Sequence, residues 1–213
     1  MAWGARRISY LIEALAFAGY VALFIWRLQT AVPRSWLVFV LWLGLSFLVR
    51  RDTPRTLGWR AGNLWPAGRR AFWFFGGAGV VICAAGLFLG MLQRVPAHFR
   101  QPEKFFTYAA FCLLQQVALN SFLTNRLLGA FEKPATAALL AGAIFGALHW
   151  PNPVLVPMTF VGGVAMAWLF ARERNILPLA LGQTVLGALI WWAFPLAWHH
   201  SMRVGPGYGV LHL

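Results

Sequence analysis

Apolar residues run through this chain in seven long segments, which are separated by shorter stretches rich in polar and basic residues. Most segments reach or approach the roughly 20 apolar residues that a helix needs to cross a bilayer core of about 30 Å. A helix also satisfies its own backbone hydrogen bonds, as a segment in lipid must. The pattern therefore predicts an all-α, polytopic membrane helix bundle with about seven transmembrane helices, at residues 8–26, 35–49, 71–93, 105–130, 136–150, 153–171 and 176–198.

The composition supports this interpretation. Hydrophobic residues make up 60% of the chain and charged residues only 11%, whereas a soluble domain carries roughly 25% charged residues. The chain has too little polar surface to cover itself in water, so we expect a lipid bilayer around it. We expect residues 1–213 to form a single membrane domain. The triplet Ala14-Leu15-Ala16 imitates a signal cleavage site, but the apolar run continues past it to Trp26, which predicts an uncleaved first helix.

The charge is strongly asymmetric, with 18 Lys and Arg against 5 Asp and Glu and a net charge of +13. In a soluble protein this excess would favour nucleic-acid binding. Here the basic residues lie between apolar runs, so we expect no nucleic-acid partner, but rather topology signals and contacts with anionic lipid. On one side of the predicted topology lie twelve of them: Arg6, Arg7, the six arginines of residues 50–70, Arg126, Lys133, Arg172 and Arg174.

The other six basic residues lie on the opposite side of the predicted topology. Cytoplasmic loops carry the excess of Lys and Arg in membrane proteins. The distribution therefore predicts an N-terminus inside and a C-terminus outside, and we expect the membrane to be the cytoplasmic (inner) membrane of a bacterium.

Two further features concern the third predicted helix and the connection before it. Residues 50–70 contain Trp59 and Trp65 beside their arginines, which favours a short amphipathic helix lying on the bilayer over a loop that carries a site. The third helix contains Gly76, Gly77 and Gly86 among its glycines. Small residues at such spacing are typical of helix–helix contacts in membranes.

Polar side chains inside predicted membrane helices mark the strongest functional candidates, because burying them in lipid is costly unless they find partners. The fourth helix contains Gln115, Gln116 and Asn120, the fifth ends at His149, and the seventh contains Gln183. Gln116 and Asn120 are four residues apart and share one helix face. At 1.5 Å per residue the depths of all these residues overlap, which predicts one polar cluster inside the bundle. The alternative is a purely structural set of hydrogen bonds between helices, worth about 1 kcal/mol or less each.

In order and spacing, residues 105–190 resemble the CPBP family of intramembrane proteases, also called the CAAX-protease and bacteriocin-processing or Abi family. The family pattern has a glutamate pair with an arginine four residues on, then FxxxH, then a second histidine. At the matching positions this chain has Gln115 and Gln116 for the glutamates, Asn120 for the arginine, Phe145 and His149 for FxxxH, and Gln183 for the second histidine. The surrounding HWPNPVL segment, which contains Asn152, adds to the resemblance.

The resemblance implies an intramembrane endopeptidase, a hydrolase acting on membrane-associated or lipidated peptides, and it implies a zinc ion as a cofactor. The differences from the family pattern argue against hydrolysis and against zinc binding. A general base must accept a proton, and a carboxamide offers only a neutral acceptor oxygen. Zinc prefers thiolate, imidazole and carboxylate ligands, and only His149 among the matched positions is such a ligand.

Three functions follow from this conflict. The first is a peptidase with a degenerate site, in which Glu13, the only acid well inside a predicted helix, replaces the missing carboxylate by packing against the fourth helix. The second is a non-catalytic pseudoprotease that binds a membrane peptide or a partner protein. The third is a small transporter with the polar cluster along its pathway.

Overall fold

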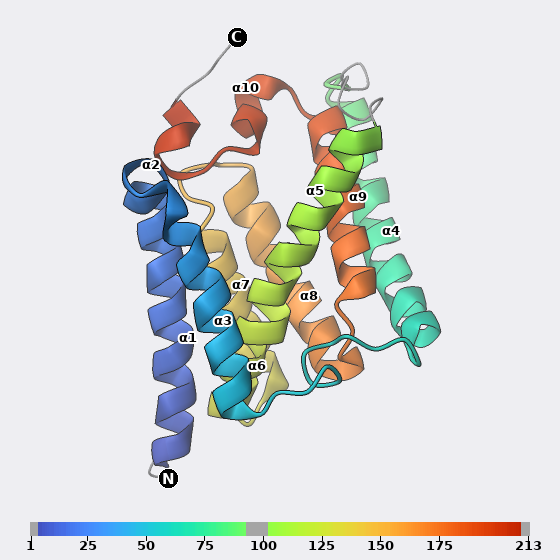
Figure 1. Ribbon diagram of the computed structural model, residues 1–213. Coiled ribbons are helices and arrows are strands. Elements are labelled where there is room, and N and C mark those ends of the chain that lie inside the picture. The colour runs from blue at the N-terminus through green and yellow to red at the C-terminus, as the bar shows by residue number, and fades with distance from the viewer. Residues whose placement is uncertain (1–3, 93–101, 210–213) are drawn as a thin grey trace.

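The computed structural model describes residues 4–92 and 102–209 (Figure 1). Over these residues the secondary structure is helical, with no strand. The main helices are α1 (Ala5–Leu23), extended by a π-helical turn (Phe24–Leu28) and α2 (Gln29–Ala31), then α3 (Trp36–Arg50), α4 (Leu64–Phe88), α5 (Pro102–Gln116), the π-helix η4 (Val117–Thr124), α6 (Asn125–Ala130), α7 (Pro134–Ala147), α8 (Leu155–Glu173), α9 (Leu177–Ala193) and α10 (Leu196–His199). Short 3-10 turns lie at Pro33–Ser35, His200–Met202 and Gly205–Gly209.

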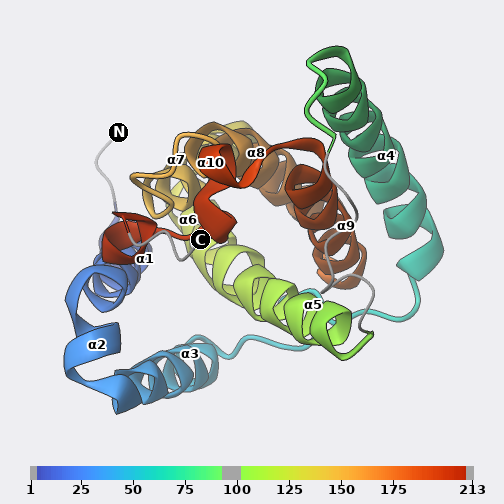
Figure 2. The ribbon, with the colours of Figure 1, turned by 90° about the horizontal axis from the view of Figure 1, so that it is seen from above.

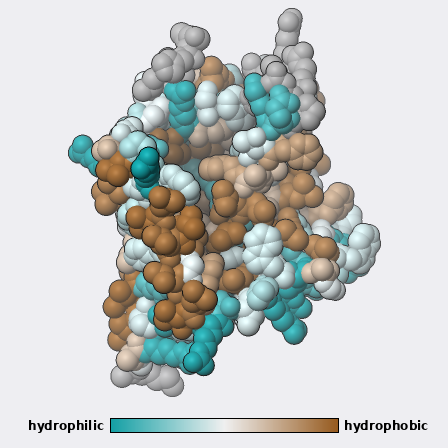
Figure 3. Space-filling model, viewed as in Figure 1, coloured by the Kyte–Doolittle hydropathy of each residue, from teal (hydrophilic) through white to brown (hydrophobic). Residues whose placement is uncertain are grey.

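The helical membrane bundle predicted from the sequence is confirmed. In the described residues, five continuous helical stretches are long and apolar enough to cross a membrane: Ala5–Ala31, Pro33–Arg50, Leu64–Phe88, Glu103–Ala130 and Leu155–Glu173. The other two predicted segments correspond to the shorter apolar helices α7 and α9. Large apolar side chains cover much of the outer surface (Figure 3), and Phe88, for example, is 90% exposed. Such a surface requires lipid around it.

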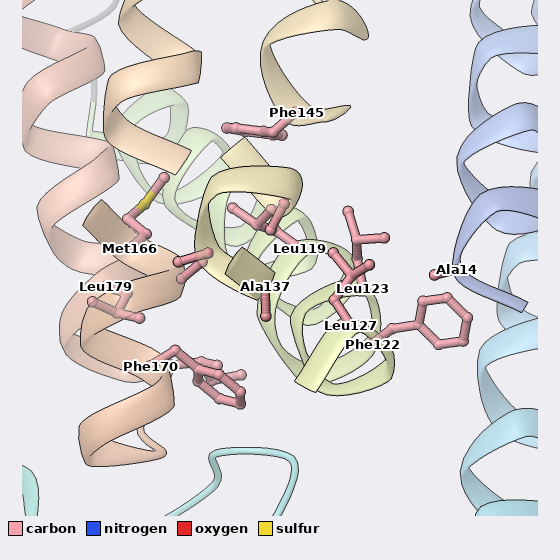
Figure 4. Packing of buried hydrophobic residues seen from close by; sticks show 14 of the residues in the cluster. Ala14, Leu119, Phe122, Leu123, Leu127, Ala137, Phe145, Met166, Phe170 and Leu179 are labelled. Carbon is pink, nitrogen blue, oxygen red and sulfur yellow. The ribbon is translucent and has the colours of Figure 1, made fainter. Parts of the chain in front are cut away.

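The bundle has a compact centre and two less enclosed flanks. Seen from above, α1 and α3 lie on one side and α4 on the other, with α5, η4, α7, α8 and α9 between them (Figure 2). The central core includes Phe122 and Phe170, which are fully buried, together with the other side chains in Figure 4. α7 and α8 approach closely at Gly142, where an added Cβ would lie 2.8 Å from the carbonyl oxygen of Phe160.

The connection between α3 and α4 corrects one expectation. Residues 51–63 form turns instead of an amphipathic surface helix, and helix α4 begins only at Leu64. The turns pack onto the end of the bundle: the backbone N–H of Ile176 donates to the carbonyl of Gly58, and the side-chain Nδ2 of Asn125 donates to the carbonyl of Thr56. Gly58 has φ +88° and lies against Phe170, so the close packing needs glycine there. Tertiary contacts therefore hold these residues as turns where a helix was expected.

The twelve basic residues of the predicted inner side lie at one end of the molecule. This arginine-rich end consists of the start of α1, the end of α3, residues 51–63, the start of α4, α6 with the turn that follows it, and the turn between α8 and α9 (Figure 1). Helix α1 begins there, and α10 lies at the opposite end. The asymmetry of charge read from the sequence is thus an asymmetry of the fold, and which side of the membrane it faces stays a prediction.

Candidate functional site

Four amide side chains meet between α5, η4 and α9. Gln116 is central: its Nε2 donates to Gln183 Oε1 at 2.6 Å, and its Oε1 accepts from Asn120 Nδ2 at 2.6 Å. Gln183 Nε2 donates in turn to Gln115 Oε1 at 2.6 Å. The structure therefore brings together four of the residues that the sequence singled out, and we call Gln115, Gln116, Asn120 and Gln183 the amide cluster.

The amide cluster has a buried end and a more open end. Gln116 and Asn120 are fully buried, whereas Gln115 and Gln183 are half-buried. At the buried end Thr124 donates to Asn120 Oδ1 at 3.1 Å and extends the chain of hydrogen bonds. Because buried polar groups are costly unless hydrogen-bonded, the mutual bonds explain how a nonpolar bundle tolerates these amides.

The π-helix η4 gives the cluster its alignment. It spans Val117–Thr124 and carries Asn120 and Thr124, while Gln116 directly precedes it. In an α-helix, residues four apart drift steadily around the axis because the period is 3.6 residues. The wider π-helical turn counters that drift, so that residues 116, 120 and 124 bond in one line. Single π-helical turns often mark functional sites, and the residue pattern gave no signal for this one.

His149 follows the end of α7 and belongs to a different set of contacts. Its Nδ1 lies 2.6 Å from the carbonyl oxygen of Phe145, and its ring packs edge-on against the Phe145 ring at 4.7 Å between centroids. In the described residues, the hydrogen bond of His149 thus goes to the preceding turn and not to the amide cluster. Phe145 is buried in the central core.

Asn152 lies at the end of the bundle opposite the arginine-rich end, where its hydrogen bonds are structural. Its Nδ2 donates to the carbonyls of His199 at 2.8 Å and Arg203 at 3.0 Å, and its Oδ1 accepts from the backbone N–H groups of Val154 and Leu155. These bonds satisfy the start of α8 and hold the C-terminal segment across the bundle end. They do not include the amide cluster.

Glu13 lies at the arginine-rich end, where it is half-buried and forms ion pairs with half-buried Arg50 and fully buried Arg126. Its carboxylate contacts Ser46 and accepts a hydrogen bond from Arg50 Nε at 2.9 Å. The carboxylate also lies 3.3 Å from Arg126 Nε. Arg126, which is 1% exposed, also bonds Asp52 Oδ2 at 2.7 Å. We call Glu13, Arg50, Asp52 and Arg126 the ion-pair cluster. The first helix does contact the fourth segment through α6, but the Glu13 carboxylate is held by arginines and not by the amide cluster.

Sequence reasoning missed that Arg126 is buried, because it was counted with the basic residues of the predicted inner side, and it did not single out Asp52. The available signal was Glu13, an acid inside an apolar segment that needs a cation nearby. Arg126 is the largest fully buried side chain in the described residues.

The residues at the matched positions do not fit a zinc ion. The amide cluster offers neutral carboxamides, which are not among the ligands that zinc prefers. Across residues 4–92 and 102–209, no three His, Cys, Asp or Glu side chains come together in a group that could hold a metal. His149 alone cannot form such a site.

A comparison with protein families identifies the segment that holds these residues. Residues 104–189 match the family described as Type II CAAX prenyl endopeptidase Rce1-like. This part of the chain is therefore similar to that family, and we call residues 104–189 the Rce1-like segment. It extends from α5 into α9 and contains the whole amide cluster together with Phe145 and His149. Comparisons with curated proteins and with solved structures returned no match.

The family match agrees with the resemblance to CAAX proteases found in the sequence. Within the Rce1-like segment, the glutamate pair and the second histidine of the CPBP pattern correspond to Gln115, Gln116 and Gln183. These three positions lie within the matched segment and are in hydrogen-bond contact, and their side chains are neutral amides.

Proposed function

We propose that this Rce1-like membrane protein binds a membrane-embedded or lipidated peptide at the amide cluster without hydrolysing it. One observation carries the proposal: the side chains at the matched positions are neutral amides that hydrogen-bond one another. A carboxamide both donates and accepts hydrogen bonds, like a peptide group. The cluster can therefore exchange an internal bond for a bond to an extended peptide backbone.

The more open end of the cluster is the place for this exchange. Gln115 and Gln183 are half-buried, and the bond between them closes that end. Hydrogen bonds between side chains in membranes are worth about 0.6 kcal/mol on average. Replacing one such bond by a bond to a ligand costs little, so most of the affinity must come from apolar side chains or a lipid group of the ligand.

The amide cluster itself lacks the groups that hydrolysis needs. No amide in the cluster can act as a general base. The carboxylate of Glu13 is paired with Arg50 and Arg126. The matched positions do not fit zinc, so no metal-bound water is supplied there.

A peptidase remains the second proposal, and one specific observation favours it. Phe145 and His149 keep the FxxxH spacing inside the Rce1-like segment. A single imidazole can act as a general base, so slow hydrolysis is the outcome to test against binding alone. The transporter alternative would need a polar pathway, whereas the amides bond one another across the interior.

The binding proposal can be tested with protein reconstituted in nanodiscs and a fluorescent peptide that ends in a prenylated cysteine. Gln183→Leu removes both bonds that join α9 to Gln115 and Gln116. We expect the dissociation constant of the peptide from this variant to be about fivefold higher than from the wild type, which corresponds to about 1 kcal/mol. Gln29→Leu is the matched control, because Gln29 is an exposed glutamine in α2. Equal affinities of the two variants would overturn the proposal.

We further propose that the protein resides in a bacterial cytoplasmic membrane with the arginine-rich end on the cytoplasmic side. The excess of positive charge at that end supports this orientation. A membrane-impermeant thiol reagent tests it: a cysteine introduced at exposed Arg55 should be protected in intact cells and labelled after lysis.

A further inference from the structure

An apolar groove runs between α4 and α9, on the side of α9 that faces away from α5. Its volume is about 840 Å³, and its walls extend from Gly68 and Pro178 to Leu87 and Trp192. At 1.5 Å per residue, the stretch of α4 from 68 to 87 is roughly 28 Å long. This length is close to the thickness of a bilayer core, so a lipid acyl chain can lie along the groove.

Two glycines keep the groove open. An added Cβ at Gly68 or Gly76 would meet no atom within 4 Å, although both residues line the groove. This finding corrects the expectation that Gly76 and Gly77 make helix contacts, whereas Gly86 does approach Ala193 closely. The helices meet instead at Gly182, which lies against the ring of Phe75. The space beside Gly68 and Gly76 is therefore unfilled by the protein's own side chains.

The wall of the groove formed by α4 continues toward the arginine-rich end. Phe72, Gly76 and Val80 line it at intervals of four residues. Arg69 lies three residues before Phe72 and seven before Gly76, and Trp65 lies seven before Phe72, so helical spacing places both on this face of α4. Trp65 is 81% exposed, and Trp residues favour the boundary between lipid and water.

Arg69 is an exposed cation at that boundary. In the described part of the chain no carboxylate pairs with it, whereas the neighbouring Arg70 pairs with Glu173. An arginine guanidinium matches the geometry of a phosphate group, to which it donates two hydrogen bonds. The face thus combines a groove for an alkyl chain with a cation for a phosphate.

We propose that the groove between α4 and α9 binds an anionic phospholipid, with an acyl chain along Gly68 and Gly76 and the headgroup phosphate at Arg69. The charge of the protein favours an anionic lipid over a neutral one, because the chain carries a net charge of +13. A basic residue near the membrane surface contributes about 1 kcal/mol to the binding of anionic membranes. The site does not include the amide cluster, because Gln183 contacts the α5 side of α9.

The acyl-chain part is tested by filling the groove. Gly76→Leu places a side chain into the open space, and Gly77→Leu is the matched control because exposed Gly77 does not line the groove. Phosphatidylglycerol and phosphatidylcholine with identical chains are added to purified protein, and bound lipid is counted by native mass spectrometry. We expect Gly76→Leu to lose most bound phosphatidylglycerol and Gly77→Leu to retain it. Gly68→Leu gives a second filling variant if Gly76→Leu fails to fold. Equal retention by filling and control variants would overturn the proposal.

The headgroup part is tested in the same assay with Arg69→Gln and the control Arg55→Gln, which removes an equally exposed charge from residues 51–63. We expect wild type and Arg55→Gln to prefer phosphatidylglycerol over phosphatidylcholine. Arg69→Gln should reduce that preference about fivefold. Equal binding of both lipids by the wild type, or an unchanged preference in Arg69→Gln, would overturn the assignment. A co-purifying protein that Gly76→Leu displaces in place of lipid would also overturn it.

Discussion

The amide cluster and the ion-pair cluster are both buried and polar, but they differ in charge and in what they join. The amide cluster is neutral and links α5 and η4 to α9, within the Rce1-like segment. The ion-pair cluster is charged and links α1 and α3 to α6. It also includes Asp52, from the turns that follow α3.

The difference in charge determines what each cluster can do. Removing one partner of a buried ion pair costs about 3–5 kcal/mol, because it leaves an uncompensated charge. Exchanging one amide bond for another costs little, since each is worth about 0.6 kcal/mol in a membrane. The ion-pair cluster therefore suits a permanent attachment of the first two membrane helices, and the amide cluster suits reversible contacts with a ligand.

The largest effect should follow from Arg126→Met, which keeps the length of the side chain and removes its charge. Glu13 would keep only Arg50 as an ion-pair partner in the described residues, and Asp52 would lose its ion pair. We expect the free energy of unfolding in detergent micelles to fall by about 3–5 kcal/mol. Arg172→Met, at an exposed position, should change it by less than about 1 kcal/mol. If both variants lost a similarly small amount of unfolding free energy, the ion-pair cluster would not be the stronger attachment that we infer.

A smaller loss is expected for Gln116→Glu, which places a carboxylate in the amide cluster. Gln116 is fully buried, and the substitution removes its donation to Gln183 and Met166. We expect the free energy of unfolding to fall by about 2–3 kcal/mol, measured by the same denaturation. The control Gln29→Glu lies at an exposed position and should be nearly neutral. No loss in Gln116→Glu would mean that the site accommodates a carboxylate, as a peptidase site does.

The smallest effect concerns the exposed ion pair between Arg7 and Glu132. The hydrogen bond and charge of Arg7 hold the pKa of Glu132 below its ordinary value of 4.5. A lowered pKa in the folded state stabilises the protein above the unfolded pKa, and the effect is lost as the pH falls through the folded value. Glu132→Gln should therefore lower Tm slightly at pH 7, and the difference from the wild type should shrink as the pH is lowered below 4.5. A drop in Tm that persists at the lower pH would contradict this origin.

Sequence patterns predicted the helical segments and the shared face of Gln116 and Asn120, because apolar length and helical spacing are local properties. The meeting with Gln183 is a contact between distant segments, and it was predicted from their matching depths in the bundle. The sequence patterns did not predict the π-helix η4, which carries Asn120 and Thr124. The turns at 51–63 depend on contacts of Gly58 with Phe170 and Ile176, far along the chain. The pairing of Arg126 with Glu13 depends in the same way on how two distant segments pack.

The central claim is that the amide cluster holds a peptide without cleaving it, and the fate of bound peptide tests this directly. Protein in liposomes is mixed with a limiting amount of prenylated peptide. The mass of the peptide in the bound and free fractions is then measured by mass spectrometry over many hours. We predict that every recovered peptide keeps its full mass, in the wild type and in His149→Ala alike. A shorter product that accumulates with the wild type and is absent with His149→Ala would contradict the account and establish a peptidase.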